Sequence, residues 1–164
     1  PTGDESSNTF VVTGIDANGN TVSESIAGKN ATASTSNTYF QTVTSVTIAV
    51  NAANAIVVGM TNTASSPWVR FDDFAPSNIS IQCNVSGSVT YTVQSTLDDP
   101  YDPISPVAAS AMTWVSSSNT NVVGAAATKQ SNFLFAPKYA RVYLTTTSTG
   151  SVSTTFLQSS NGPI

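Results

Sequence analysis

The sequence predicts an all-β protein built as an antiparallel β-sandwich of the jelly-roll kind. Short segments alternate apolar and polar residues, which is the period of a half-buried strand. Turn-forming residues separate these segments at intervals of roughly ten residues, as in sandwiches and jelly rolls. Sustained helical periods with capping residues are missing, and we expect only one short helical turn, at residues 106–112.

The first part of the chain predicts a hairpin followed by a long strand. Residues 9–15 and 21–26 are rich in β-branched residues and flank the turn cluster 16–20. This cluster resembles the start of a calcium loop, but the glutamate that such a loop needs at its end is missing, which favours a hairpin turn. Residues 39–50 predict a strand with a bulge, because the apolar phase shifts between Val43 and Val46.

The later segments predict a short strand and two more hairpins. We expect a short strand at residues 55–60 and a crossover between two halves of the sandwich at 61–67. Residues 79–85 and 89–97 alternate most clearly and predict a hairpin around Gly87, which can adopt a positive φ. The final hairpin is expected from residues 139–146 and 151–158.

Length and composition favour one folded domain. The chain has 164 residues, of which 40% are hydrophobic, so it can bury a core. We expect a single sandwich domain over residues 1–164, with residues 1–8 as an extended N-terminal arm. The single cysteine, Cys83, cannot form an intrachain disulfide and lies on the apolar phase of its strand, which favours a core residue over a reactive thiol.

The charge content disfavours several classes of function. The chain has no histidine, and charged residues make up only 9% of it, so it is poor in groups that do chemistry near neutral pH. We therefore expect no enzymatic activity and no cofactor. The net charge of −4 and five scattered cations argue against nucleic-acid binding. Apolar runs approaching the roughly 20 residues of a membrane helix are missing, and the N-terminus is polar, so we expect a soluble protein without membrane contact that the general secretory route does not export.

Five carboxylates fall into two clusters, Asp72–Asp73 and the Asp98, Asp99 and Asp102 group of the segment 98–103. Paired carboxylates can bind Ca²⁺ or act as the acid and base of a glycosidase. Asp and Pro at strand ends are also ordinary turn residues, and this interpretation is favoured here. The spacings of a zinc site, a nucleophile elbow and a phosphate-binding loop are all missing.

A set of aromatic residues and one arginine is the best candidate for a binding surface. Tryptophan and arginine are favoured as interface anchors, and aromatic rings also stack on sugars. In a single sandwich most of the set would lie in the core, which is the favoured interpretation. The set comprises Trp68, Arg70, Phe71, Phe74 and Trp114, and the candidate interface residues are Trp68, Arg70, Phe71 and Trp114.

Several stretches of the chain share a pattern with a known class of proteins. They are TGIDANGNTVSESIAG at residues 13–28, YFQTVTSV at 39–46, VTYTVQSTLDDP at 89–100, Trp114, PKYARV at 137–142 and FLQ at 156–158. Together they resemble virion structural proteins of tailed bacteriophages, in particular capsid decoration or head-stabilising proteins. The resemblance implies a β-rich, repeated surface component of a phage particle, commonly a trimer on the capsid exterior.

We therefore expect a non-enzymatic capsid decoration, or cement, protein that binds the major capsid protein at the outer capsid surface of the virion and stabilises the head. A homotrimer is expected also because an oligomer would cover weakly charged β-surfaces and strand edges. The alternatives are a tail-, neck- or fibre-associated virion protein, and an adhesin module that binds host glycan through Trp68 or Trp114 and an acidic loop.

Overall fold

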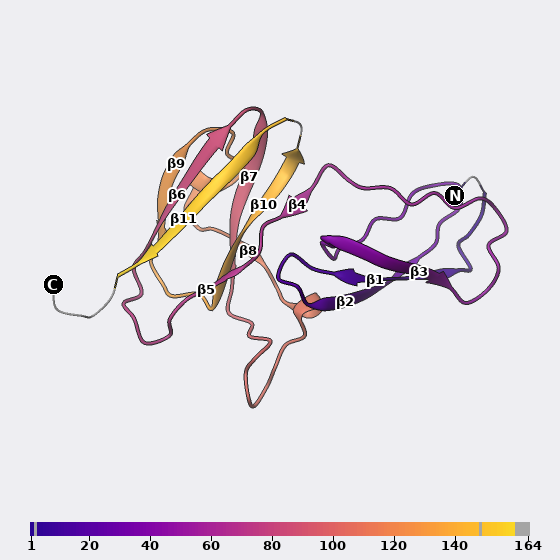
Figure 1. Ribbon diagram of the computed structural model, residues 1–164, viewed down its shortest axis with the longest axis horizontal. Helices are drawn as coiled ribbons and strands as arrows, with labels where there is room; N and C mark the ends of the chain where they lie inside the picture. The colour runs from indigo at the N-terminus through magenta and orange to yellow at the C-terminus, as the bar shows by residue number, and fades with distance from the viewer. Residues whose placement is uncertain (2, 148, 160–164) are drawn as a thin grey trace. The chain divides into compact units, whose positions relative to one another are not determined.

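The computed structural model describes residues 1, 3–147 and 149–159, and these form three antiparallel sheets (Figure 1). The chain divides into two compact units, Pro1–Met60 and Thr61–Ile164. The all-β class and the antiparallel sandwich are confirmed, and the jelly-roll topology stays a prediction. The sandwich lies in the second unit and the first unit has a separate sheet, whereas we expected one sandwich over residues 1–164.

The first unit is a three-stranded sheet in the order β2-β1-β3, made of β1 (Thr9–Ile15), β2 (Thr21–Ala27) and β3 (Thr42–Ile48). β1 and β2 pair directly, which confirms the first hairpin. Its turn is held by Asp16, whose Oδ1 accepts hydrogen bonds from the backbone N–H groups of Asn18 (2.8 Å) and Asn20 (2.9 Å). Gly19 supplies a positive φ of 83°. The cluster 16–20 is therefore a hairpin turn.

The expected bulge is present in β3, but the expected short strand after it is not. Thr13 pairs with Ser45 and Gly14 with Val43, so Thr44 is the extra residue, between Val43 and Val46 as predicted. Residues 55–60 lie outside any strand, and the prediction for them is wrong. Their β-propensity acts only where a neighbouring strand offers pairing and burial, and no strand pairs with them.

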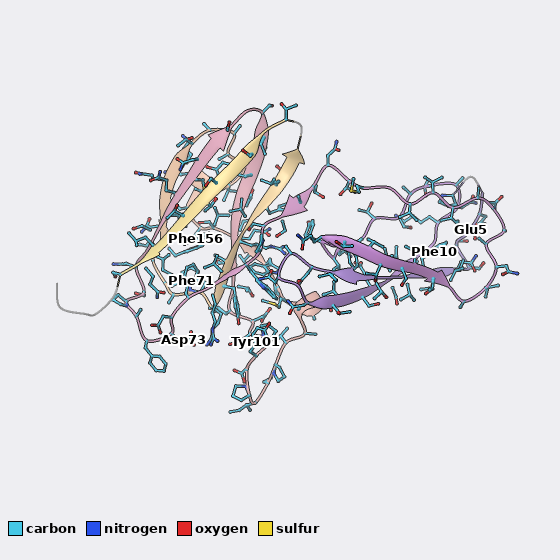
Figure 2. The ribbon with its side chains drawn as sticks, viewed as in Figure 1. Glu5, Phe10, Phe71, Asp73, Tyr101 and Phe156 are labelled. Atoms are coloured by element: carbon cyan, nitrogen blue, oxygen red, sulfur yellow. The ribbon has the colours of Figure 1, made fainter. Side chains whose placement is uncertain are left out.

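Residues 3–8, expected to form an extended arm, are bound to the first unit. The Glu5 side chain, labelled in Figure 2, accepts hydrogen bonds from the Asn8 side chain and from the backbone N–H of Asn54 at 2.8 Å. It is fully buried. The bond from Asn8 is the main reason that the pKa of Glu5 lies below its ordinary value. Glu5 thus links the N-terminus to the segment after β3.

The second unit is a sandwich of two sheets. The first sheet contains β4 (Ala64–Ser65), β10 (Tyr139–Thr147), β7 (Val89–Thr96) and β8 (Val115–Ser116) in that order, with β5 (Val69–Arg70) also paired to β10. The second sheet has the order β11 (Ser151–Gln158), β6 (Ile79–Ser86) and β9 (Lys129–Phe133).

Two short 3₁₀ helices, η1 (Ala109–Ala111) and η2 (Thr120–Val122), lie in the connections of this unit. η1 matches the helical turn expected at 106–112. Neither helix in the described residues is long and apolar enough to cross a membrane. Both sheets of the sandwich follow Met60, so residues 61–67 are not a crossover between its halves and instead contain β4.

The two later hairpins are wrong in their pairing, although their strands are in the predicted places. β6 pairs with β11 and β9, whereas β7 pairs with β10 and β8, so the connection at Gly87 passes from one sheet to the other. The same holds for β10 and β11. Ile81 and Val93 are both buried between the sheets. A strand that buries alternate residues has the same pattern in a hairpin and in an arch between two sheets, and so the sequence did not separate them.

The core lies between the two sheets and is closed by aromatic rings. Its buried members are Phe71, Ile79, Ile81, Cys83, Tyr91, Val93, Val122, Phe133, Ala140 and Val142. Phe71 packs edge-on against Phe156 at 5.7 Å between ring centroids (Figure 2). Cys83 is fully buried, and burial raises the pKa of its thiol, which confirms it as a core residue.

Candidate functional site

Three long connections meet at one end of the sandwich. In one sheet, the first residue of β6 pairs with the last residues of β9 and β11. In the other sheet, the first residue of β10 pairs with the last residues of β7 and β5. The connections 71–78, 97–114 and 134–138 therefore leave the strands at this end, which we call the loop end. It contains both predicted aspartate clusters.

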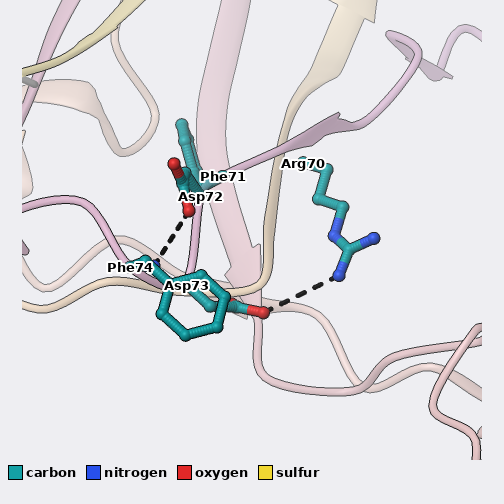
Figure 3. A pocket seen from close by; sticks show the side chains of 5 residues that line it. All are labelled: Arg70, Phe71, Asp72, Asp73 and Phe74. Atoms are coloured by element: carbon teal, nitrogen blue, oxygen red, sulfur yellow. Dashed lines mark hydrogen bonds and ion pairs between the residues drawn. The ribbon is translucent and has the colours of Figure 1, made fainter.

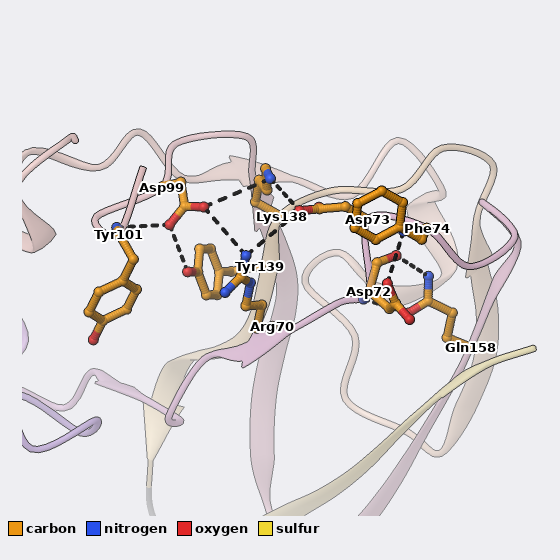
Figure 4. Close-up of polar contacts among 9 residues, drawn as sticks. All are labelled: Arg70, Asp72, Asp73, Phe74, Asp99, Tyr101, Lys138, Tyr139 and Gln158. Carbon is orange, nitrogen blue, oxygen red and sulfur yellow. Dashed lines mark hydrogen bonds and ion pairs between the residues drawn. The ribbon is translucent and has the colours of Figure 1, made fainter. Parts of the chain in front are cut away.

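Asp99 is the centre of a polar network at the loop end (Figure 4). Its side chain is only 7% exposed. One carboxylate oxygen, Oδ1, accepts hydrogen bonds from the Tyr101 backbone N–H and the Tyr139 hydroxyl, both at 2.9 Å. These bonds connect the connection after β7 to the first residue of β10.

Two cations bridge Asp99 to Asp73 in the neighbouring connection. Lys138 Nζ lies 2.6 Å from Asp73 Oδ2 and 3.8 Å from Asp99 Oδ2. Arg70 Nη2 lies 3.7 Å from Asp73 Oδ2 and 3.9 Å from Asp99 Oδ2. Arg70 is exposed and Lys138 half-buried, so each single ion pair contributes little. Together the four pairs tie the connection after β5, the connection after β7 and the start of β10 to one another.

The network holds Asp99 in its ionised form. The hydrogen bond from the Tyr101 backbone is the largest reason that the pKa of Asp99 lies below its ordinary value, and the bond from Tyr139 and the two cations act in the same direction against the effect of burial. Burial, followed by the bond to Asp99, raises the pKa of Tyr139 to about 12. A catalytic general acid needs a raised pKa, so the lowered pKa of Asp99 does not suit that role.

Asp72 and Asp102 form turns, as the sequence favoured, whereas Asp73 pairs with Arg70 and Lys138 and Asp98 bonds to a distant segment. Asp72 Oδ1 accepts a hydrogen bond from the Phe74 backbone at 2.9 Å, and Asp102 Oδ1 accepts from Ile104 at 2.8 Å. Asp98 Oδ2 accepts from the backbone of Thr113. In the part of the chain that the structure describes, no three carboxylate or thiol groups gather closely enough to hold a metal ion.

The side chain of Gln158, the last residue of β11, joins the second sheet to this end (Figure 4). Its amide accepts a hydrogen bond from the Asp72 backbone N–H at 2.9 Å and donates to the Asp72 carbonyl at 3.0 Å. The same amide donates to the carbonyl of Pro76 at 3.3 Å. Connection 71–78 is therefore fixed to both sheets.

The predicted interface residues separate into three environments. Phe71 is 5% exposed and belongs to the core, so it is not available to a partner, because the end of β5 turns its ring between the sheets. Arg70 lies at the loop end in the ion-pair network. Phe74, three residues after Phe71, is 93% exposed. Residues 70–74 line a shallow pocket whose rim carries Phe74 (Figure 3).

Trp68 and Trp114 come together although 46 positions separate them in the sequence. Their ring centroids lie 5.8 Å apart, and Trp68 also lies 5.4 Å from the ring of Tyr139. The Arg141 guanidinium covers the Trp114 ring at 4.2 Å, in cation–π geometry. Both tryptophans are half-buried, so the rings are packed together and partly accessible.

Sequence reasoning missed a group of exposed apolar side chains in the loop-end connections. They are the exposed side chains of Leu97, Tyr101, Ile104, Leu134 and Phe135. Apolar residues inside an Asp- and Pro-rich turn segment, where a surface turn is expected to be polar, were the available signal.

The comparisons with protein-family models, with curated proteins and with solved structures gave no match.

Proposed function

We propose that this chain is a non-enzymatic structural protein of a tailed-phage virion, a decoration protein that binds the outer capsid surface and stabilises the head. The observation that carries the proposal is the use of charge at the loop end. There, carboxylates hold two connections by backbone hydrogen bonds and the third through the ion pairs of Lys138, and the three connections expose large apolar side chains. This arrangement suits adhesion, because apolar side chains that are already held in place lose little conformational freedom on binding.

Repetition on a shell would strengthen such adhesion. Burying apolar surface contributes roughly 25 cal/mol per Å², so a few side chains give a weak contact for one copy. A homotrimer joins three such contacts, and each further contact then forms at a high effective concentration. We propose this trimer as the assembly that binds the major capsid protein, with three-fold symmetry that matches the three-fold positions of an icosahedral shell.

The proposed function is tested by removing the protein from the particle. Phage particles that lack the chain should release their DNA at a lower temperature and under milder osmotic shock than particles that carry it. Adding the purified chain back should restore resistance, which separates its effect from damage during assembly. Equal release with and without the chain would contradict the proposal.

The assembly is tested by sedimentation of the purified protein at micromolar concentration. We expect a species near three times the chain mass of 16.9 kDa. A species near the mass of one chain would contradict a trimer that forms without the capsid.

The paired tryptophans favour a second candidate, an adhesin module that binds host glycan. Trp68 and Trp114 are half-buried and adjacent, and Asp98 is bound to Thr113, the residue before Trp114. Aromatic rings beside a carboxylate suit sugars, which offer apolar faces and hydroxyl donors. Specific binding to a glycan array that Trp114→Ala abolishes, in a variant with an unchanged circular dichroism spectrum, would favour this candidate. A repeat with chelator shows whether binding needs Ca²⁺.

A further inference from the structure

Ion pairs and hydrogen bonds hold the connections of the loop end in place. Asp99 and Asp73 share the two cations Arg70 and Lys138, and Gln158 fixes the segment after β5 to the second sheet. The connections therefore leave the sandwich in a defined arrangement. Preorganisation of this kind lowers the entropic cost of binding a partner.

The connections held by these contacts expose large apolar side chains. Phe74 is 93% exposed, Ile104 is 92% exposed and Leu134 is 76% exposed, one from each of the three connections. Single exposed apolar residues are common on protein surfaces, but here each of three neighbouring connections exposes one. Tyr101, also exposed, adds an aromatic ring of the type that is enriched at interface anchors.

Charge distinguishes this end from the rest of the second unit. The loop end contains five carboxylates and two cations, a net charge of −3, whereas the other charged residues of residues 61–164 are the cations Lys129 and Arg141. Both loop-end cations lie within ion-pair distance of Asp73 and Asp99. Asp72 and Asp102 instead accept backbone hydrogen bonds. A partner surface that meets this end needs Lys or Arg side chains around apolar residues.

We propose that the loop end is the surface by which the chain docks on the shell, against a basic and apolar patch of the major capsid protein. This inference rests on the proposed function and adds the contacting face and the chemistry of its partner. Phe74 and Ile104 supply the apolar contact. The excess of carboxylates selects the basic patch and accelerates association at low ionic strength.

Binding to particles that lack the chain tests the inference. The double variant Phe74→Ser, Ile104→Ser should bind such particles roughly tenfold or more weakly than the unmodified chain, measured by co-sedimentation. Val123→Ser after η2 and Val57→Ser in the first unit are matched controls, because they also remove exposed apolar side chains but lie outside the loop end. Both controls should bind within about twofold of the unmodified chain. Unchanged thermal melts for all variants establish that each is folded.

A charge variant tests the chemistry of the partner separately. Asn keeps an oxygen that can accept the backbone hydrogen bonds, so Asp72→Asn, Asp102→Asn removes charge and retains the turns. This variant should associate more slowly and show a weaker dependence on salt than the unmodified chain.

The outcomes separate the inference from the proposed function. If the unmodified chain does not bind the particles, the proposed function fails and the inference fails with it. If it binds, and the serine double variant binds equally well, the inference is overturned and the proposed function stands. A double variant that sediments as a monomer where the unmodified chain is a trimer would identify the loop end as a contact between copies, and would also overturn the inference.

Discussion

The Tyr139 hydroxyl donates a hydrogen bond to Asp99 Oδ1 at 2.9 Å, and both side chains are buried. Tyr139 is the first residue of β10, and Asp99 lies in the connection that follows β7, so the bond fixes the connection to the sheet. Burying the Asp99 carboxylate costs free energy of desolvation. The hydrogen bond from the Tyr101 backbone and the ion pairs with Arg70 and Lys138 offset this cost. The proposed docking surface depends on this relationship.

Replacing Asp99 with Asn should therefore destabilise the second unit. The variant keeps the size of the side chain but removes the charge that Tyr139, Arg70 and Lys138 face, and hydrogen bonds to charged groups contribute about 1.5–3 kcal/mol each. We expect the free energy of unfolding at pH 7, from urea titration, to fall by about 2 kcal/mol. Asp16→Asn in the first hairpin turn is the control and should change it by less than about 1 kcal/mol. Equal stability of Asp99→Asn and the unmodified chain would contradict the role given to Asp99.

The contribution of Asp99 should disappear in acid. Hydrogen bonding from the Tyr101 backbone, more than any other interaction, lowers the pKa of Asp99 from its ordinary value of 3.8. A carboxyl with a depressed pKa in the folded state stabilises the fold above its unfolded pKa, and this stability is lost as the pH falls through the folded pKa. The stability difference between the unmodified chain and Asp99→Asn should be constant above about pH 5 and shrink below about pH 4. A difference that stays constant into that acid range would show that Asp99 is not held ionised.

The core between the sheets should be sensitive to small cavities. Ile81 and Val93 are buried on facing sheets, so Ile81→Ala and Val93→Ala should each lower the free energy of unfolding by about 1–4 kcal/mol. Leu157→Ala removes an exposed side chain from β11 and should lower it by less than about 1 kcal/mol. Thermal melts unchanged by both core substitutions would contradict the assignment of these residues to the core.

The connection at Gly87 should tolerate a side chain less well than the turn at Gly19. Both residues have a positive φ, which costs a residue with Cβ about 1–2 kcal/mol. A Cβ at Gly87 would also lie 2.9 Å from the backbone of Thr149 and Gly150, whereas nothing lies within 4 Å of one at Gly19. Gly87→Ala should therefore lower the melting temperature more than Gly19→Ala. Equal effects would contradict the close approach of the two connections.

The alternation of apolar and polar residues predicted most strands, because each strand of the sandwich buries one face against the other sheet. It did not predict which strands pair, because alternation is the same in a hairpin and in an arch between sheets.

At the candidate site, the sequence likewise did not predict which residues of a cluster are buried. Asp98 and Asp99 are adjacent and chemically identical, yet only Asp99 is buried among cations, and Phe71 is core while Phe74 is exposed. These differences arise from contacts between segments far apart in the chain, such as Asp99 with Tyr139.

Localising the chain on an intact particle tests the central claim most directly. Under the proposed function, electron cryo-microscopy of phage particles that carry the chain, compared with particles that lack it, assigns the difference density to one position. We predict density on the outer surface of the head, at three-fold positions, with the loop end of each copy against the major capsid protein. Difference density confined to the tail, neck or fibres, or no difference between the two particles, would contradict the claim.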